Sequence, residues 1–262
     1  MLFRSLHILA FLYQHTKMIT LPTTPQPALR INPKRLLLYG PPKVGKTTAL
    51  TGLKNCLIVD CEEGSENVEA LRVSVHNFAE LEDCAKAIRA ASHKYDYIAL
   101  DTITAIEEWC EVEGTRMYKA SSIGKSFTES TVLNLPNGAG YEWLRRAFHK
   151  VLFMFDGLAP HIILVGHLRE KFISGKEQKT DNLVATKDLD LTGKIKAIAA
   201  SKSDAIGYMF RDYKKDGRLS ISFETQEAVN CGCRCPHLRG KTICLQEDKN
   251  KSTEINWKEI YL

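Results

Sequence analysis

The sequence predicts an α/β fold in which a mainly parallel β-sheet is flanked by helices, with a β-hairpin toward the C-terminus. Three observations support this prediction. Short apolar runs alternate with segments whose apolar residues recur at helical spacing. A glycine-rich turn follows the first apolar run, and two later runs end in aspartate. In sheets of this kind, ligands bind at the carboxyl ends of the strands.

The composition is that of a folded domain. Of the 262 residues, 44% are apolar and 26% are charged, and the formal net charge is +5. This charge permits a polyanionic partner but does not require one. We expect residues 1–33 to be an N-terminal extension and linker, and residues 34–262 to form one domain. Residues 1–17 are mostly apolar, but their apolar run from Leu6 to Tyr13 is too short to span a bilayer, so no membrane attachment is expected. The sequence leaves open whether these residues belong to the working protein.

The first elements follow from apolar runs and turn residues. Four prolines in residues 19–34 predict an extended lead-in. The apolar run 35–39 ends at a glycine loop and predicts a buried strand, after which a helix is expected over 46–53. A second buried strand is predicted over 56–60, with an acid at its carboxyl end.

The middle of the chain repeats this alternation. We predict a short strand at 73–75, a helix over 78–91, a strand over 97–101 and a helix over 104–119. The polar, glycine- and serine-rich stretch 121–138 is predicted to be a mobile loop.

The last third supplies one long helix and three more strands. A helix is predicted over 140–155, and its expected apolar side consists of Tyr141, Leu144, Phe148, Val151, Leu152 and Phe155. A buried strand is predicted over 161–166, then a charged stretch over 168–190 and a helix over 193–202. Strands over 206–211 and 218–223 flank Lys214-Lys-Asp-Gly217, which has the chemistry of a hairpin turn.

The glycine-rich turn matches the phosphate-binding pattern G-x-x-x-x-G-K-[ST], with a strand before it and a helix after it. Glycines let successive backbone N–H groups point inward around phosphates, and the helix N-terminus adds its positive dipole end. Lys46 is expected to reach the β- and γ-phosphates of ATP, and Thr47 to ligate Mg²⁺. The predicted nucleotide-binding residues are Gly40, Pro41, Pro42, Lys43, Val44, Gly45, Lys46, Thr47 and Thr48.

Polar residues at the ends of three strands complete the predicted site. Asp101, after the apolar run 97–100, has the form of a Walker B acid that holds Mg²⁺, although an aspartate there also suits a helix cap. Glu62 and Glu63 follow the second strand, where a carboxylate orients the attacking water. Spacing alone does not choose between them, or between that role and a solvent-facing loop. His167 is expected to contact the γ-phosphate or merely to end its strand.

Taken together, these segments resemble the RecA-type ATPase core, and more narrowly the phage-encoded RecA-like ATPases that act as single-strand annealing recombinases. The narrower resemblance rests on Leu135-Pro-Asn-Gly-Ala-Gly-Tyr141, on Leu191-Thr-Gly-Lys-Ile-Lys196 and on Asn256-Trp-Lys-Glu-Ile260. It covers about residues 34–262. In such cores a glutamate follows the second strand as Asp-x-Glu, which Asp60-Cys61-Glu62 matches, so the resemblance implies that Glu62 is the catalytic base and His167 the polar sensor.

The resemblance also implies a single-stranded DNA partner and a homo-oligomer, either ring or filament, with a single-strand DNA-binding protein as a further partner. The stretch 167–218 holds twelve Lys or Arg and eight Asp or Glu. Basic residues neutralise phosphates and aromatic residues stack on bases, although a charge run is often only a solvated face. The candidate DNA contacts are Arg169, Lys171, Phe172 and Lys176, with Lys179 near them. Lys194, Lys196 and Lys202 are candidates to reach a neighbouring subunit's ATP.

Eight cysteines raise the question of disulfides or zinc. An ATP-using protein belongs in a reducing cytoplasm, that of the host cell if the protein is phage-encoded. Four cysteines within predicted strands and helices are therefore expected to be free thiols: Cys56, Cys61, Cys84 and Cys110. The segment Cys231-Gly-Cys-Arg-Cys235, with Cys244, has spacing unlike paired C-x-x-C zinc sites. A structural zinc stays an open alternative.

The sequence therefore predicts a magnesium-dependent ATPase that acts on single-stranded DNA in phage recombination or strand annealing. Two alternatives remain. A nucleotide or small-molecule kinase also begins with this loop, although residues 167–190 contain only one arginine for a lid, Arg169. The other is an ATPase switch or motor subunit for helicase loading or DNA packaging.

Overall fold

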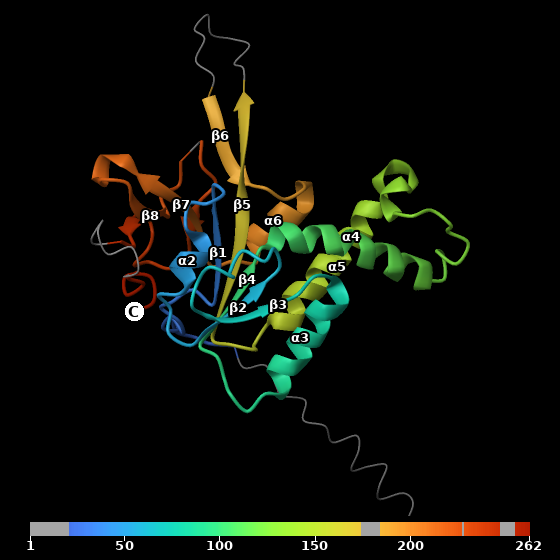
Figure 1. The fold of residues 1–262 in the computed structure, drawn as a ribbon, viewed down its shortest axis with the longest axis horizontal. Coiled ribbons are helices and arrows are strands. Elements are labelled where there is room, and N and C mark those ends of the chain that lie inside the picture. Colours follow the sequence, from blue (N-terminus) through green and yellow to red (C-terminus); the bar gives the residue numbers. More distant parts are fainter. Residues whose placement is uncertain (1–20, 174–183, 227, 247–254) are drawn as a thin grey trace, which may run out of the picture. The chain divides into compact units, whose positions relative to one another are not determined.

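A computed structural model describes residues 21–173, 184–226, 228–246 and 255–262 (Figure 1). The chain divides into two units, residues 1–30 and residues 31–262. In the first unit, residues 21–30 are exposed and form no helix or strand. All the elements below belong to the second unit.

One mixed, mostly parallel sheet forms the centre of this unit, with the strand order β10-β8-β7-β1-β5-β4-β2-β3. Six strands of this order are parallel: β1 (Arg35–Gly40), β2 (Cys56–Asp60), β3 (Leu71–Ser74), β4 (Tyr97–Asp101), β5 (His161–Ile173) and β7 (Ala205–Asp212). The strands β6 (Val184–Leu189), β8 (Arg218–Ser222), β9 (Gly232–Cys233) and β10 (Thr242–Cys244) pair antiparallel with their neighbours. The strand β5 separates β1 from β4, so it lies between the phosphate loop and Asp101.

The helices of the described residues are α2 (Lys46–Leu50), α3 (Phe78–Ala90), α4 (Ile103–Ala120), α5 (Gly140–Phe155) and α6 (Gly193–Ser201). Short 3₁₀ turns occur at η1 (Val132–Asn134), η2 (Pro136–Gly138) and η3 (Tyr213–Lys215). Side-chain caps fix where the long helices begin. Asn77 accepts a hydrogen bond from the Glu80 N–H at the start of α3, and Thr102 accepts one from the Ala105 N–H at the start of α4.

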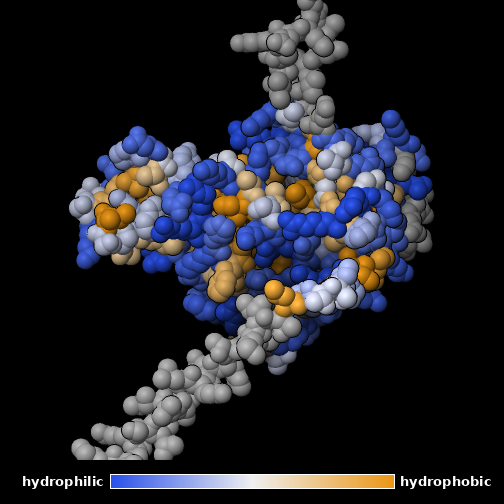
Figure 2. All heavy atoms as spheres, turned by 180° about the vertical axis from the view of Figure 1, so that it is seen from behind, coloured by the Kyte–Doolittle hydropathy of each residue, from blue (hydrophilic) through white to orange (hydrophobic). Residues whose placement is uncertain are grey.

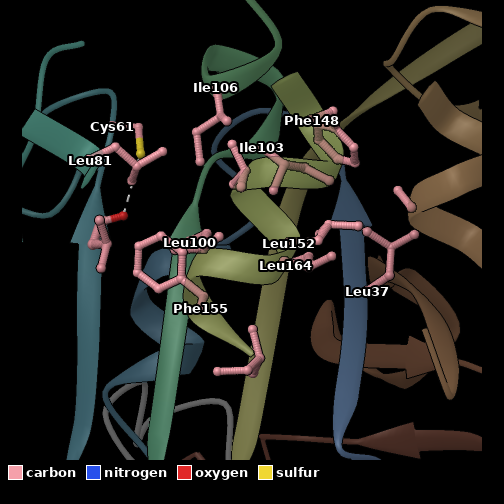
Figure 3. Packing of buried hydrophobic residues seen from close by; sticks show 14 of the residues in the cluster. Leu37, Cys61, Leu81, Leu100, Ile103, Ile106, Phe148, Leu152, Phe155 and Leu164 are labelled. Atoms are coloured by element: carbon pink, nitrogen blue, oxygen red, sulfur yellow. Dashed lines mark hydrogen bonds between the residues drawn. The ribbon is translucent and has the colours of Figure 1, made fainter. Parts of the chain in front are cut away.

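The inner parts of the central strands are apolar because both faces of the sheet are covered there. On one face, alternate side chains such as Leu37, Leu100 and Leu164 pack against α3, α4, α5 and α6 (Figure 3). On the other face, their neighbours in the strands pack against α2 and the C-terminal segment, which contributes Trp257 and Ile260. Two cores therefore hold the strand ends in a fixed register.

The predicted α/β class, the mainly parallel sheet and the β7–β8 hairpin are confirmed. The strand predicted at 161–166 is wrong in length, because β5 continues to Ile173 and pairs with β6 as a second hairpin. The predicted charged stretch is thus partly a β-ribbon, which has little apolar periodicity because it leaves the core. Regular α-helix in α2 ends at Leu50 rather than near residue 53.

Two further predictions need correction. The stretch 121–138, predicted to be a mobile loop, contains η1 and η2, and Val132 within it is fully buried. The Val132 N–H donates to the Thr115 hydroxyl of α4 at 3.0 Å, which ties the segment to that helix. Tyr141 does not belong to the buried side of α5, since it is 46% exposed.

The face seen from behind is mainly hydrophilic, with apolar residues scattered over it (Figure 2). Among the residues that the structure describes, no helix has the length and apolar character needed to cross a membrane.

Candidate nucleotide-binding site

The phosphate loop leaves β1 at Gly40 and enters α2 at Lys46. Gly40 has to be glycine because a Cβ there would lie 2.4 Å from the Met209 carbonyl oxygen of β7. Gly45 has φ 110°, a left-handed conformation that side chains oppose. These two glycines allow the chain to curl between a buried strand and a buried helix start, which is the geometry a phosphate cup requires.

Lys46 is buried, and its ammonium lies inside this curl. Its Nζ donates to the carbonyl oxygens of Gly40 and Pro41, both at 3.0 Å, and lies 3.5 Å from His167 Nδ1. Burial lowers the pKa of Lys46, while the nearby carboxylates of Asp101 and Glu62 act in the opposite direction. Because Lys46 is buried, water solvates its charge poorly, and an anion bound in the loop would neutralise that charge.

A pocket of about 370 Å³ opens on the loop and brings the predicted polar residues together. Its wall includes Lys46 and Thr47 of α2, Glu62 after β2, Asp101 at the end of β4 and His167 of β5. These residues come from four elements, and the parallel register places them together, because it pairs Gly40 with His167, Asp60 with Asp101 and Asp101 with Val165.

Thr47 and Asp101 form a pair of oxygen donors. The Thr47 hydroxyl donates to Asp101 Oδ2 at 2.6 Å. Burial raises the pKa of Asp101, and the hydrogen bond from Thr47 opposes that shift. A hydroxyl and a buried carboxylate are ligands suited to Mg²⁺, and a cation would offset the cost of burying the carboxylate. The alternative role of Asp101 as the helix cap is not what the structure shows, because the residue that caps α4 is Thr102.

The two glutamates after β2 differ in their surroundings. Glu62 faces the pocket, and its carboxylate accepts hydrogen bonds from Thr102 Oγ1 at 2.8 Å and from His167 Nε2 at 3.0 Å. The bond with His167 lowers the pKa of Glu62, burial opposes this and Thr102 adds to it. Glu63 has φ 57°, and its side chain is 65% exposed and 3.6 Å from His76. The geometry therefore favours Glu62 as the carboxylate that serves the phosphate site.

His167 does not end its strand, which corrects the sequence-based expectation. It lies within β5, where the sheet core gives way to the ribbon with β6. Its ring connects Lys46 to Glu62, and its backbone N–H donates to Thr104 Oγ1 at 3.2 Å. The side chain thus faces the phosphate pocket while its main chain leads into the ribbon.

Asp60 shapes the turn that carries Glu62. Its carboxylate accepts backbone N–H bonds from Glu62 at 3.1 Å, Gly64 at 3.2 Å and Ser65 at 2.8 Å, and it also accepts the Ser65 hydroxyl. Burial alone would raise the pKa of Asp60, but the bonds from Ser65, Glu62 and Gly64 together lower it. The role of Asp60 is therefore to order the turn rather than to enter the pocket.

Asp60→Asn is expected to destabilise the folded chain by about 2 kcal/mol at neutral pH, because a buried charged acceptor loses part of its bonding. The folded-state pKa of Asp60 lies below the unfolded value, so its contribution is present above the unfolded pKa and is lost as pH falls through the folded pKa. Urea unfolding at pH 7 and pH 3 should show a smaller difference between the variant and the wild type at pH 3. Asp83→Asn, an exposed carboxylate of α3 paired with Lys86, is the control and should change little. If Asp60→Asn lowers the free energy of unfolding equally at pH 7 and pH 3, the role of the Asp60 carboxylate in ordering the turn is contradicted.

The structure adds two residues that sequence reasoning missed. Thr102 follows Asp101 and bonds Glu62. Arg211 of β7 donates from Nε to the Val44 carbonyl oxygen of the phosphate loop at 3.1 Å and from Nη1 to Gln246 Oε1 at 2.7 Å. Thr102 is adjacent to a predicted residue and could have been considered. Arg211 carries no local signal, because it reaches the loop only through the pairing of β7 with β1.

Two of the predicted DNA contacts, Arg169 and Lys171, do not line the nucleotide pocket. Arg169 and Lys171 are exposed on the β5 part of the ribbon, and Arg169 Nη1 is 3.8 Å from Asp190 Oδ1. Phe172 lies in the same strand, while Lys176 and Lys179 are outside the described residues. Of the three lysines near α6, Lys196 forms an ion pair with Asp188, Lys202 is exposed and Lys194 lines a second pocket.

That second pocket has a volume of about 580 Å³ and lies between the starts of α5 and α6. Its lining includes Tyr141, Arg145 and Lys194. Arg145 also donates to Glu142 at 2.6 Å. An aromatic ring beside two cations is the side-chain chemistry that holds a nucleotide unit of a single strand.

All eight cysteines are free thiols in the structure, including the four for which this was expected, Cys56, Cys61, Cys84 and Cys110. Over the described residues, no group of three or more His, Cys, Asp or Glu is arranged to hold a metal ion. Instead, Cys233 Sγ accepts the Cys235 N–H at 3.0 Å, so the segment near Cys231 is closed by local hydrogen bonds.

Among the comparisons with known proteins, the family model is the one that identifies a family for this chain. A family model described as "AAA domain" matches residues 32–235. The comparison with curated proteins gave no match. Among solved structures, one described as "Crystal structure of the RadB recombinase" aligns over 86% of this chain and 91% of that chain, with 12% sequence identity and a TM-score of 0.44. A likeness at that level carries no argument about function.

Proposed function

The chain belongs to the AAA domain family, and from this premise we propose that it hydrolyses ATP with Mg²⁺ and couples the nucleotide state to single-stranded DNA in recombination or strand annealing. The observation that supports hydrolysis is the single pocket in which Lys46, the Thr47–Asp101 pair and Glu62 meet. A binding protein without turnover would need the loop and the lysine but not a carboxylate fixed beside them.

In the proposed reaction, Glu62 accepts a proton from a water molecule whose oxygen forms the new bond to the γ-phosphorus. The bond between that phosphorus and the bridging oxygen breaks, and its electron pair leaves with ADP. Lys46 and the backbone N–H groups of residues 43–47, which follow Pro41 and Pro42, balance the negative charge on the phosphates. Thr47 and Asp101 would hold Mg²⁺, which would supply further neutralisation of the phosphate oxygens.

His167 is proposed to connect this reaction to DNA. Its ring forms a hydrogen bond with the Glu62 carboxylate. The next six residues of the same strand form the ribbon with β6. Because β5 is one continuous strand, a shift of the ring toward or away from the γ-phosphate acts on the base of the ribbon. The ribbon's exposed Arg169 and Lys171 and the second pocket, with Tyr141, Arg145 and Lys194, are the surfaces proposed to meet the strand.

Saturating oligothymidine is expected to raise the ATPase rate several-fold. Arg169→Ala/Lys171→Ala should weaken strand binding about 10-fold and lower the slope of log K against log salt by about 1 to 1.5, because two phosphate contacts are lost. Fluorescence anisotropy at several salt concentrations measures both quantities. The matched control is Lys54→Ala/Lys94→Ala, two exposed lysines that precede β2 and β4 and so lie at the opposite edge of the sheet.

An ATPase rate that saturating strands leave unchanged would contradict the coupling to DNA. Size-exclusion chromatography with ATP, with DNA and with both distinguishes a monomer from the ring or filament that we propose. An annealing assay with complementary strands then separates recombination from a switch or motor role, since only the former predicts accelerated pairing.

A further inference from the structure

The carboxylate of Glu62 is held by two side chains of different kinds. His167 Nε2 lies 3.1 Å from Oε1 and 3.0 Å from Oε2, so the imidazole spans both oxygens. Thr102 Oγ1 donates to Oε1 alone, at 2.8 Å. The hydroxyl therefore distinguishes the two carboxylate oxygens and the imidazole does not.

The direction of the Thr102 hydroxyl is fixed by its place in the helix. Thr102 is the N-cap of α4, and its Oγ1 accepts the Ala105 N–H at 3.3 Å. A hydroxyl has one proton to donate. With the helix N–H directed at its oxygen, that proton is free for Glu62, the carboxylate within hydrogen-bonding distance.

The support behind Thr102 is rigid. The residue is 2% exposed, and it stands between β4 and the 18-residue helix α4. The carbonyl oxygen of the preceding residue, Asp101, accepts the Cys61 N–H at 2.7 Å, which ties the start of α4 to the turn that carries Glu62. The Thr102 hydroxyl and the Glu62 carboxylate thus lie at the ends of neighbouring strands, which fix the separation between them.

The charged groups around Glu62 do not perform this task. Lys46 attracts the carboxylate, and Asp101 repels it. Such forces act on the charge of the group as a whole. His167 bonds both oxygens at nearly equal distances, so it does not select one of them. A directional bond to one oxygen distinguishes that oxygen from the other.

We propose that Thr102 is a positioning residue for the reaction proposed above: its hydroxyl holds Oε1 of Glu62, and Oε2 is thereby presented to the water that attacks the γ-phosphate. This inference rests on the proposed ATPase function. It assigns Thr102 no contact with ATP, so it predicts an effect on turnover and none on nucleotide affinity.

The test compares Thr102→Val, which keeps the shape but removes the hydroxyl, with Thr102→Ser, which keeps the hydroxyl. For Thr102→Val, kcat is expected to fall between about 10-fold and 100-fold, the value of one hydrogen bond to a charged group. Its Kd for a non-hydrolysable ATP analogue should stay within about 2-fold of the wild type. Thr102→Ser should restore most of kcat. A merely structural loss would alter binding and rate together and would not follow the hydroxyl.

Thr131→Val is the matched control, because Thr131 also caps a helical turn with its hydroxyl, accepting the Leu133 N–H at 3.2 Å, but lies outside the nucleotide pocket. Its kcat should equal that of the wild type. Thr102→Ala provides a second hydroxyl-free variant, and either one that binds the analogue with wild-type affinity is folded well enough to decide the question. Loss of analogue binding in both would assign Thr102 to holding the loop and overturn the proposal.

The outcomes separate this inference from the proposed function. A wild-type protein that binds the analogue but does not turn over ATP refutes the ATPase proposal itself. A wild-type protein that hydrolyses ATP, together with Thr102→Val at full kcat, refutes only the role of Thr102.

Discussion

Lys46→Ala is expected to abolish ATP binding at ordinary nucleotide concentrations, with Kd raised at least about 100-fold. The ammonium already lies in the curl of the loop, where it is held by two carbonyl oxygens. Phosphate oxygens would replace or supplement these neutral acceptors with charged ones, and charge-assisted bonds of this kind are the strong ones. Calorimetric titration with MgATP or a non-hydrolysable analogue measures the change.

The same substitution separates binding from folding. Burial lowers the pKa of Lys46, which means that the ligand-free protein gains little from the charge. The melting temperature without nucleotide should therefore change little, while the rise that saturating MgATP causes in the wild type should disappear. Lys54→Ala, an exposed lysine after α2, should keep that rise. If Lys46→Ala still binds ATP with wild-type affinity, the loop is not the nucleotide site.

Glu62→Gln is expected to keep ATP affinity and to lower kcat by about 10² to 10⁴-fold, the range for removing a general base. Glutamine preserves the size of the side chain and an oxygen for Thr102, but it accepts no proton from water. Single-turnover hydrolysis of radiolabelled ATP measures the rate, and analogue titration measures the affinity.

Glu63→Gln is the internal control for this experiment. The two glutamates are adjacent, yet the side chain of Glu63 is 65% exposed and faces His76 rather than Lys46. Its kcat should stay near that of the wild type. Loss of turnover in Glu63→Gln with normal turnover in Glu62→Gln would exchange the two assignments.

The contact between Glu62 and His167 gives the Glu62→Gln variant a further use. His167 bonds the carboxylate proposed as the catalytic base and directly precedes the ribbon whose exposed basic residues are proposed to meet DNA. If that connection couples the two sites, the coupling must act in both directions on binding free energies. In Glu62→Gln, hydrolysis is too slow to mix the ATP-bound and the ADP-bound protein. The affinity of this variant for single-stranded DNA should then differ between ATP and ADP.

Much of the site was available from the sequence alone. The phosphate loop could be predicted because its residues are contiguous and because its glycines are required by the local backbone. Gly45, for example, has φ 110°, a conformation that residues with a side chain rarely adopt. The buried strands could be predicted because a parallel sheet covered on both faces requires unbroken apolar runs. The acids at their ends could then be placed at one edge, since parallel strands bring their carboxyl ends together. Membership of the narrower phage annealing group stays a prediction.

Tertiary structure decided what depends on register and on side-chain direction. Spacing could not separate Glu62 from Glu63, because the choice follows from which of them the turn around Asp60 directs toward Lys46. The sequence also gave no sign that β5 continues past His167, since that part of the strand pairs outside the core and has no apolar pattern to reveal it. Arg211 reaches the loop across 167 positions of the chain. Such contacts are fixed by the packing of whole elements, which no local pattern records.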